Sequence, residues 1–87
     1  SELNPTDYSL FENTGVSYYM SSEYDKSLEY LNIVIDSMNP ATGKSEFIAA
    51  SIYIKKNDIS KICQYANLAA EMDYPGSYGI ISQFCRN

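Results

Sequence analysis

The sequence of 87 residues contains no histidine and no tryptophan, and it has only two cysteines. Without histidine, the side chain that most often serves as a general base or metal ligand near neutral pH is missing. Basic residues are also scarce, since six lysines and arginines against eleven aspartates and glutamates give a net charge of −5. Because phosphates and anionic lipids require a basic protein face, we expect neither a nucleic-acid partner nor an anionic membrane partner.

Long apolar runs are missing as well. No stretch approaches the roughly 20 apolar residues that cross a bilayer, so we expect no membrane insertion. No basic segment followed by an apolar one opens the sequence, so we expect no secretory signal within it. The aromatic residues are mostly tyrosines, nine in all, whose apolar ring and polar tip suit half-buried helix faces and protein contact surfaces.

Apolar residues recur at spacings of three and four through most of the chain, which predicts helices. Thr6, Ser22 and Ser77 are the predicted N-caps, Asn57-Asp58 a turn with a cap, and Asn39-Pro40 a break. Gly15 lies inside the first pattern, where glycine is unfavourable, so we expect a neighbouring helix to approach it closely. The patterns predict an all-α chain with no strand and with helices over residues 8–20, 23–38, 44–56, 59–73 and 78–85.

The second half of the sequence resembles the first at an offset of 35 residues. Spaced identities with matching breaks are typical of stacked two-helix units, because one helical hairpin cannot bury its apolar face alone. The identities pair Tyr18 with Tyr53, Lys26 with Lys61, Tyr30 with Tyr65, Asn32 with Asn67 and Pro40 with Pro75.

The residues of the first unit resemble the tetratricopeptide repeat signature. Phe11-x-x-Thr14-Gly15-x-x-Tyr18 is similar to its first helix, with Thr14 in place of leucine, and Ser27-x-x-x-Leu31 is similar to its second. The second unit keeps Ala49-Ala50-x-x-Tyr53 but has Glu46 at the aromatic position. Ile62 and Ala66 there exchange the small and large positions of the second helix, which conserves total volume.

This resemblance implies a single domain over residues 1–87. Its antiparallel helix hairpins would stack as about two and a half repeats in a short right-handed superhelix. Repeat one would span about residues 8–40, repeat two about 43–75, and a capping helix about 77–86.

The resemblance also implies a function, that of a non-enzymatic scaffold binding a peptide or partner protein in a concave groove lined by the first helix of each repeat. A homo-oligomer, or a place in a larger repeat protein, is also open. For Met20 and Ile54, packing between repeats is an equally open role. The groove residues implied are Glu12, Asn13, Val16, Tyr19 and Met20 from the first unit and Phe47, Ser51, Ile54 and Lys55 from the second.

Cys63 and Cys85 lie nearly equidistant from the Pro75-Gly76 break. If the fourth and fifth helices run antiparallel around that break, the two side chains face each other and can form a disulfide. The alternative is two buried free thiols that pack as small apolar groups. A free pair favours a cytoplasmic location, whereas a bridged pair indicates an exported or periplasmic protein.

Carboxylates are the only abundant ionisable groups, and Glu23, Asp25, Glu29 and Asp36 fall largely on one helix face. We interpret them as solvated surface rather than acid/base catalysts, and no phosphate-binding loop, nucleophile motif or metal motif accompanies them. We therefore expect no enzyme activity and no cofactor. The net negative charge leaves an alternative function open, that of a small acidic immunity or inhibitor protein that blocks a basic toxin or enzyme.

Overall fold

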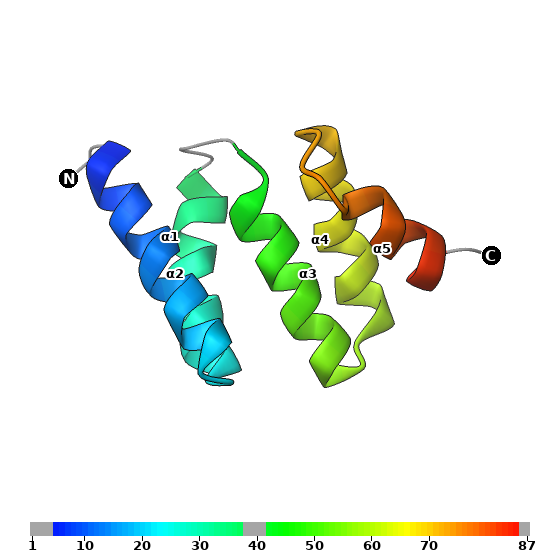
Figure 1. Ribbon diagram of the computed structural model, residues 1–87, viewed down its shortest axis with the longest axis horizontal. Coiled ribbons are helices and arrows are strands. Elements are labelled where there is room, and N and C mark those ends of the chain that lie inside the picture. Colours follow the sequence, from blue (N-terminus) through cyan, green and yellow to red (C-terminus); the bar gives the residue numbers. More distant parts are fainter. Residues whose placement is uncertain (1–4, 38–41, 86–87) are drawn as a thin grey trace. The chain divides into compact units, whose positions relative to one another are not determined.

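The computed structural model describes residues 5–37 and 42–85, and within these ranges every regular element is an α-helix. This confirms the predicted all-α fold and the five helices (Figure 1). The chain divides into two compact units, residues 1–41 and 42–87, and the division falls between the two predicted repeats. The helices are α1 (Pro5–Met20), α2 (Tyr24–Ser37), α3 (Lys44–Lys56), α4 (Ile59–Glu71) and α5 (Ser77–Phe84).

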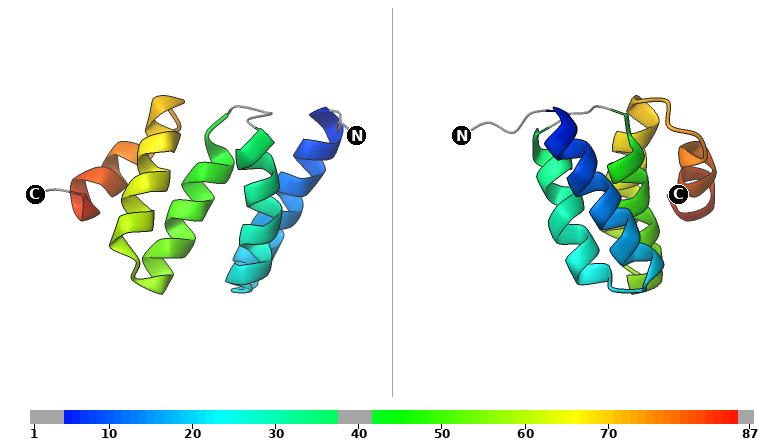
Figure 2. Two further views of the ribbon diagram at one scale, coloured as in Figure 1. Left: turned by 180° about the vertical axis from the view of Figure 1, so that it is seen from behind. Right: turned by 60° about the vertical axis from the view of Figure 1, so that its left-hand side comes forward.

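The first unit is an antiparallel hairpin of α1 and α2 (Figures 1 and 2). Its helices approach most closely at Gly15, where an added Cβ would lie 2.7 Å from Cδ2 of Leu31. The hydroxyl of Ser27, which is fully buried, donates a hydrogen bond of 2.6 Å to the Gly15 carbonyl. The close approach expected at Gly15 is therefore present, and glycine is required there because a larger residue would overlap Leu31.

The turn between α1 and α2 corrects one predicted cap. Ser22 has a left-handed backbone (φ 62°), and its N–H donates to the Tyr19 carbonyl at 3.0 Å. The N–H of Glu23 donates to the Tyr18 carbonyl at 2.9 Å, which completes a Schellman-type end for α1. Ser22 thus ends the first helix instead of capping the second.

The start of α1 and the end of α2 also differ from expectation. The helix begins at Pro5, so Thr6 lies within its first turn and is not its N-cap. Proline is favoured at the first helical position because its fixed φ suits a helix and its missing N–H has no partner to lose. The predicted helix end at Met38 and the Asn39-Pro40 break lie outside the described residues.

The second unit contains the α3–α4 hairpin, with α5 packed against α4. Its turn repeats the first one 35 residues later, since Asn57 is left-handed (φ 60°) and the N–H of Asp58 donates to the Tyr53 carbonyl at 3.1 Å. The Asp58 carboxylate also accepts a hydrogen bond of 3.2 Å from the N–H of Lys61, so Asp58 is the N-cap of α4 as predicted. The bounds predicted for α3 are those observed.

The connection from α4 to α5 was less well predicted. Helix α4 ends at Glu71, two residues before the predicted end, because Asp73 adopts a left-handed backbone (φ 58°). Helix α5 begins at Ser77 with Gly76 at its N-cap position, so the predicted cap at Ser77 is wrong. The Ser77 side chain is instead fully buried.

Each hairpin has a small core. The exchange of small and large residues between the hairpins is complete, because Ser27 and Leu31 in one and Ile62 and Ala66 in the other are all at most 1% exposed. The two hairpins therefore have the same backbone arrangement, but their large and small buried side chains stand at exchanged positions. The remaining buried apolar residues are Leu28 and Val34 in the first unit and Ala49, Ala50, Ile52, Ala69 and Ala70 in the second.

Candidate functional site

Each hairpin contains its own pair of packed tyrosines, at equivalent positions. The rings of Tyr18 and Tyr30 lie 5.7 Å apart between centroids with an interplanar angle of 22°. Their counterparts 35 residues later, Tyr53 and Tyr65, lie 5.5 Å apart at 12°. Both distances fall in the range for favourable aromatic packing. The internal repeat is thus present in side-chain packing as well as in sequence, and these tyrosines are structural.

Part of the predicted binding surface in the first unit is exposed on α1. Asn13 and Met20 are exposed, with Met20 77% accessible, and Val16 is half-buried beside them. Leu10, one of the apolar residues of this helix, is 58% exposed. We call the exposed residues that follow one another at helical spacing the α1 outer stripe; they are Leu10, Asn13, Ser17 and Met20.

Two of the predicted residues of the first unit do not belong to this surface. Glu12 is only 8% exposed, so little of its side chain is accessible to a partner. Tyr19 is half-buried, and its ring lies 6.0 Å from that of Tyr24 across the hairpin turn. Its aromatic ring therefore contributes to the hairpin itself.

The predicted binding residues of the second unit also differ in how far they are exposed. Phe47 packs on Tyr74, with 5.0 Å between ring centroids, and the Ser51 hydroxyl donates to the Phe47 carbonyl at 3.0 Å. Both are half-buried and contribute to the packing of α3 and to its backbone. Ile54 is half-buried, whereas Lys55 is exposed. Lys55 is therefore the predicted residue of this unit most accessible to a partner.

Charge is distributed unequally along the chain. Residues 1–41 contain seven carboxylates and one lysine, for a net charge of −6, whereas residues 42–87 contain four carboxylates and five basic residues, for a net charge of +1. On α2 the carboxylates of Asp25, Glu29 and Asp36 are exposed around Ile33, which is itself 42% exposed. The net charge of the whole chain does not reveal this asymmetry, whereas the charge of each repeat, counted from the sequence, does.

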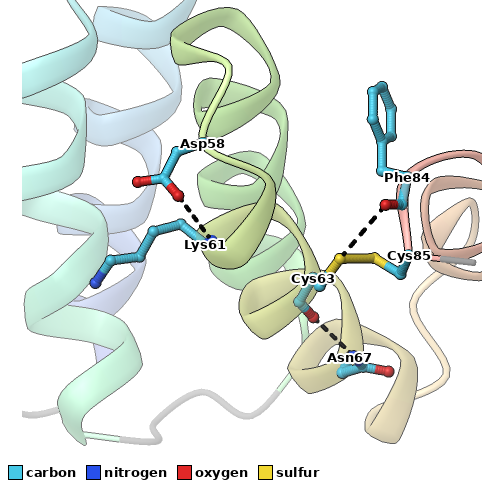
Figure 3. The surroundings of a disulfide bond; sticks show 6 residues. All are labelled: Asp58, Lys61, Cys63, Asn67, Phe84 and Cys85. Atoms are coloured by element: carbon cyan, nitrogen blue, oxygen red, sulfur yellow. Dashed lines mark hydrogen bonds between the residues drawn. A yellow bond between two sulfur atoms is a disulfide. The ribbon is translucent and has the colours of Figure 1, made fainter. Parts of the chain in front are cut away.

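Cys63 and Cys85 are joined by a disulfide, with 5.6 Å between their Cα atoms (Figure 3). The bond links α4 to the residue that follows α5, and both cysteines are half-buried. The Cys63 sulfur lies 3.8 Å from the Phe84 carbonyl oxygen, as marked in Figure 3. A disulfide sulfur carries no hydrogen, so this is a packing contact and not a hydrogen bond.

Neither a cluster of metal-ligating side chains nor a membrane-spanning helix occurs within residues 5–37 and 42–85. In those ranges no three His, Cys, Asp or Glu side chains are grouped so as to hold a metal ion. Nor does any helix in the described part of the chain combine the length and apolar character needed to cross a membrane. Comparison with protein-family models, with curated proteins and with solved structures gives no match. A functional inference therefore depends on the surfaces described above.

Proposed function

We propose that this chain is a non-enzymatic protein-binding module of tetratricopeptide-like construction, and that the α1 outer stripe is a contact surface for its protein or peptide partner. The observation that carries the proposal is the exposure of Leu10 and Met20 on one face of a helix, with short polar side chains between them. A partner that covers these two side chains removes their apolar surface from water. A methionine there adapts its shape to the surface it meets.

The comparison of equivalent positions supports this proposal. The packed tyrosines and the turn that ends the first helix are the same in both hairpins. The positions of the α1 outer stripe correspond to Ser45, Ile48, Ile52 and Lys55 on α3, and of these four only Lys55 is exposed. The exposed stripe is thus a feature of α1 that the repeated frame does not itself require.

The test is a quantitative affinity purification with the wild type and a Leu10→Ser/Met20→Ser variant. Ile59→Ser is the matched control, because Ile59 is 54% exposed but lies on α4, in the other unit. We expect proteins retained by the wild type and by the control to be lost from the stripe variant. Retention of the same proteins by all three, with unchanged helix content by circular dichroism, would refute a contact surface on α1.

The unequal charge favours a second candidate, an acidic inhibitor that blocks a basic protein. Residues 1–41 carry a net charge of −6, and exposed carboxylates lie along α2. Such a charge would accelerate association with a basic partner, with a strong dependence on ionic strength. Against the captured partner, Glu29→Lys/Asp36→Lys should slow association at low salt by about tenfold or more. Glu71→Lys, an exposed carboxylate of the second unit, is the control and should have a smaller effect.

A further inference from the structure

Helix α5 packs against α4 but contributes few buried side chains. It contains eight residues, which is too short for a helix to be stable alone in water. Ser77 is its only buried residue, whereas α3 and α4 contribute five and four buried residues respectively. None of the apolar side chains of α5 is fully buried, and Tyr78 is 65% exposed. Burial of apolar area therefore holds α5 in place less firmly than it holds α3 and α4 together.

Ser77, the first residue of α5, destabilises the packing of this helix against α4. The Ser77 hydroxyl is fully buried, and no hydrogen-bond partner for it is found among the described residues. A buried hydroxyl that has lost its water and gained no partner destabilises the state that buries it. Opening of α5 would return this hydroxyl to water, so the hydroxyl favours the open position.

The covalent attachment lies at the opposite end of the helix. Cys85 directly follows α5 and is bonded to Cys63 on α4, 22 residues earlier in the chain. Cys63 and Ala70 are seven residues apart on α4 and so share a face, and Ala70 is only 7% exposed. The disulfide thus closes a ring that keeps α5 over this face of α4 (Figure 3).

From these three observations we infer that the Cys63–Cys85 disulfide is a redox latch, and that its reduction releases α5 from α4 while the α3–α4 hairpin stays folded. The reductant is a dithiol. One of its thiolates attacks a sulfur of the protein disulfide and forms a mixed disulfide, which its second thiol then resolves. Two electrons and two protons pass to the protein, leaving two cysteine thiols and the oxidised reductant. Neither cysteine residue is fully buried, and access to a sulfur is what such an attack requires. This inference does not depend on the proposed function.

The experiment is amide hydrogen exchange on the whole chain, oxidised and after reduction with dithiothreitol. In the reduced protein we expect the Ile80 and Cys85 amides, which donate to the Gly76 and Ile81 carbonyls, to exchange about tenfold faster or more. The Ile62 amide of α4, which donates to Asp58, should be unchanged. Removal of dithiothreitol and reoxidation should restore the slow exchange of α5.

Two outcomes would overturn the latch. In one, the amides of α5 exchange at the same rate in the oxidised and the reduced protein. In the other, reduction accelerates amide exchange in α3 and α4 as much as in α5, which would mean that the disulfide stabilises the unit as a whole.

A Cys63→Ala/Cys85→Ala variant controls for the reagent. Its amides should exchange at the rates of the reduced wild type, with or without dithiothreitol. In reduced protein, Ser77→Ala should slow the exchange of α5, because it removes the unpartnered hydroxyl; unchanged or faster exchange would contradict that part of the inference.

Discussion

The two hairpins reach the same backbone arrangement by different means. In residues 1–41 a glycine brings the helices into near contact, Leu31 fills the space beside it, and the Ser27 hydroxyl bonds across to the glycine carbonyl. In residues 42–87 the equivalents are Ala50, Ala66 and Ile62, and all three are buried. The comparison indicates that the hairpin specifies a total core volume and one small contact point, and leaves open which position on its second helix supplies the large side chain.

The largest effect should come from placing the first unit's residue in the second. Ile62→Ser removes most of a fully buried apolar side chain and leaves a cavity in the core, so we expect the free energy of unfolding to fall by about 3–5 kcal/mol. Urea unfolding followed by circular dichroism measures it. Ile59→Ser, one turn earlier and 54% exposed, is the control and should cost less than about 1 kcal/mol. Equal losses would mean that Ile62 is not a core residue of this hairpin.

A smaller effect is expected at the close contact of the first hairpin. Gly15→Ala places a methyl group 2.7 Å from Leu31, so overpacking by about 1–3 kcal/mol should outweigh the helix propensity gained. Gly15→Ala/Leu31→Ala rebuilds the alanine pair of the second hairpin. A double-mutant cycle should therefore give a total loss smaller than the sum of the single losses, by about 0.5 kcal/mol or more. Strict additivity would show that the two residues do not share the contact.

How far the sequence predicted this fold depends on the kind of signal. The apolar spacing of α3 between Gly43 and Asn57 predicted both of its ends. The end of α4 and the start of α5 were not predicted, because they depend on left-handed residues at Asp73 and Gly76. A serine near a break in the pattern does not reveal whether it precedes a helix or begins it. Local sequence thus specified the helices better than their caps.

The candidate site was predicted less well, because exposure depends on neighbouring helices. Asn13 and Met20 are exposed as the family resemblance implied, whereas Glu12 is buried although charged residues rarely are. Leu10 is exposed although leucine usually packs inside. Residue type alone does not predict the exposure of these two residues, because it depends on the packing around α1.

The smallest effect should separate the two turns, which share a backbone but not a side-chain cap. The Asp58 carboxylate accepts from the N–H of Lys61, so Asp58→Ala should reduce the free energy of unfolding by about 1 kcal/mol. Its equivalent Glu23 forms an exposed ion pair of 3.5 Å with Lys26, and such pairs contribute little, so Glu23→Ala should cost less than about 0.5 kcal/mol. Urea unfolding of both variants at low and high salt checks this. A cap is a short-range hydrogen bond, whereas an exposed ion pair is screened by salt. The loss of unfolding free energy caused by Glu23→Ala should therefore shrink at high salt, and the loss caused by Asp58→Ala should not. If salt changes both losses equally, the two turns are stabilised in the same way.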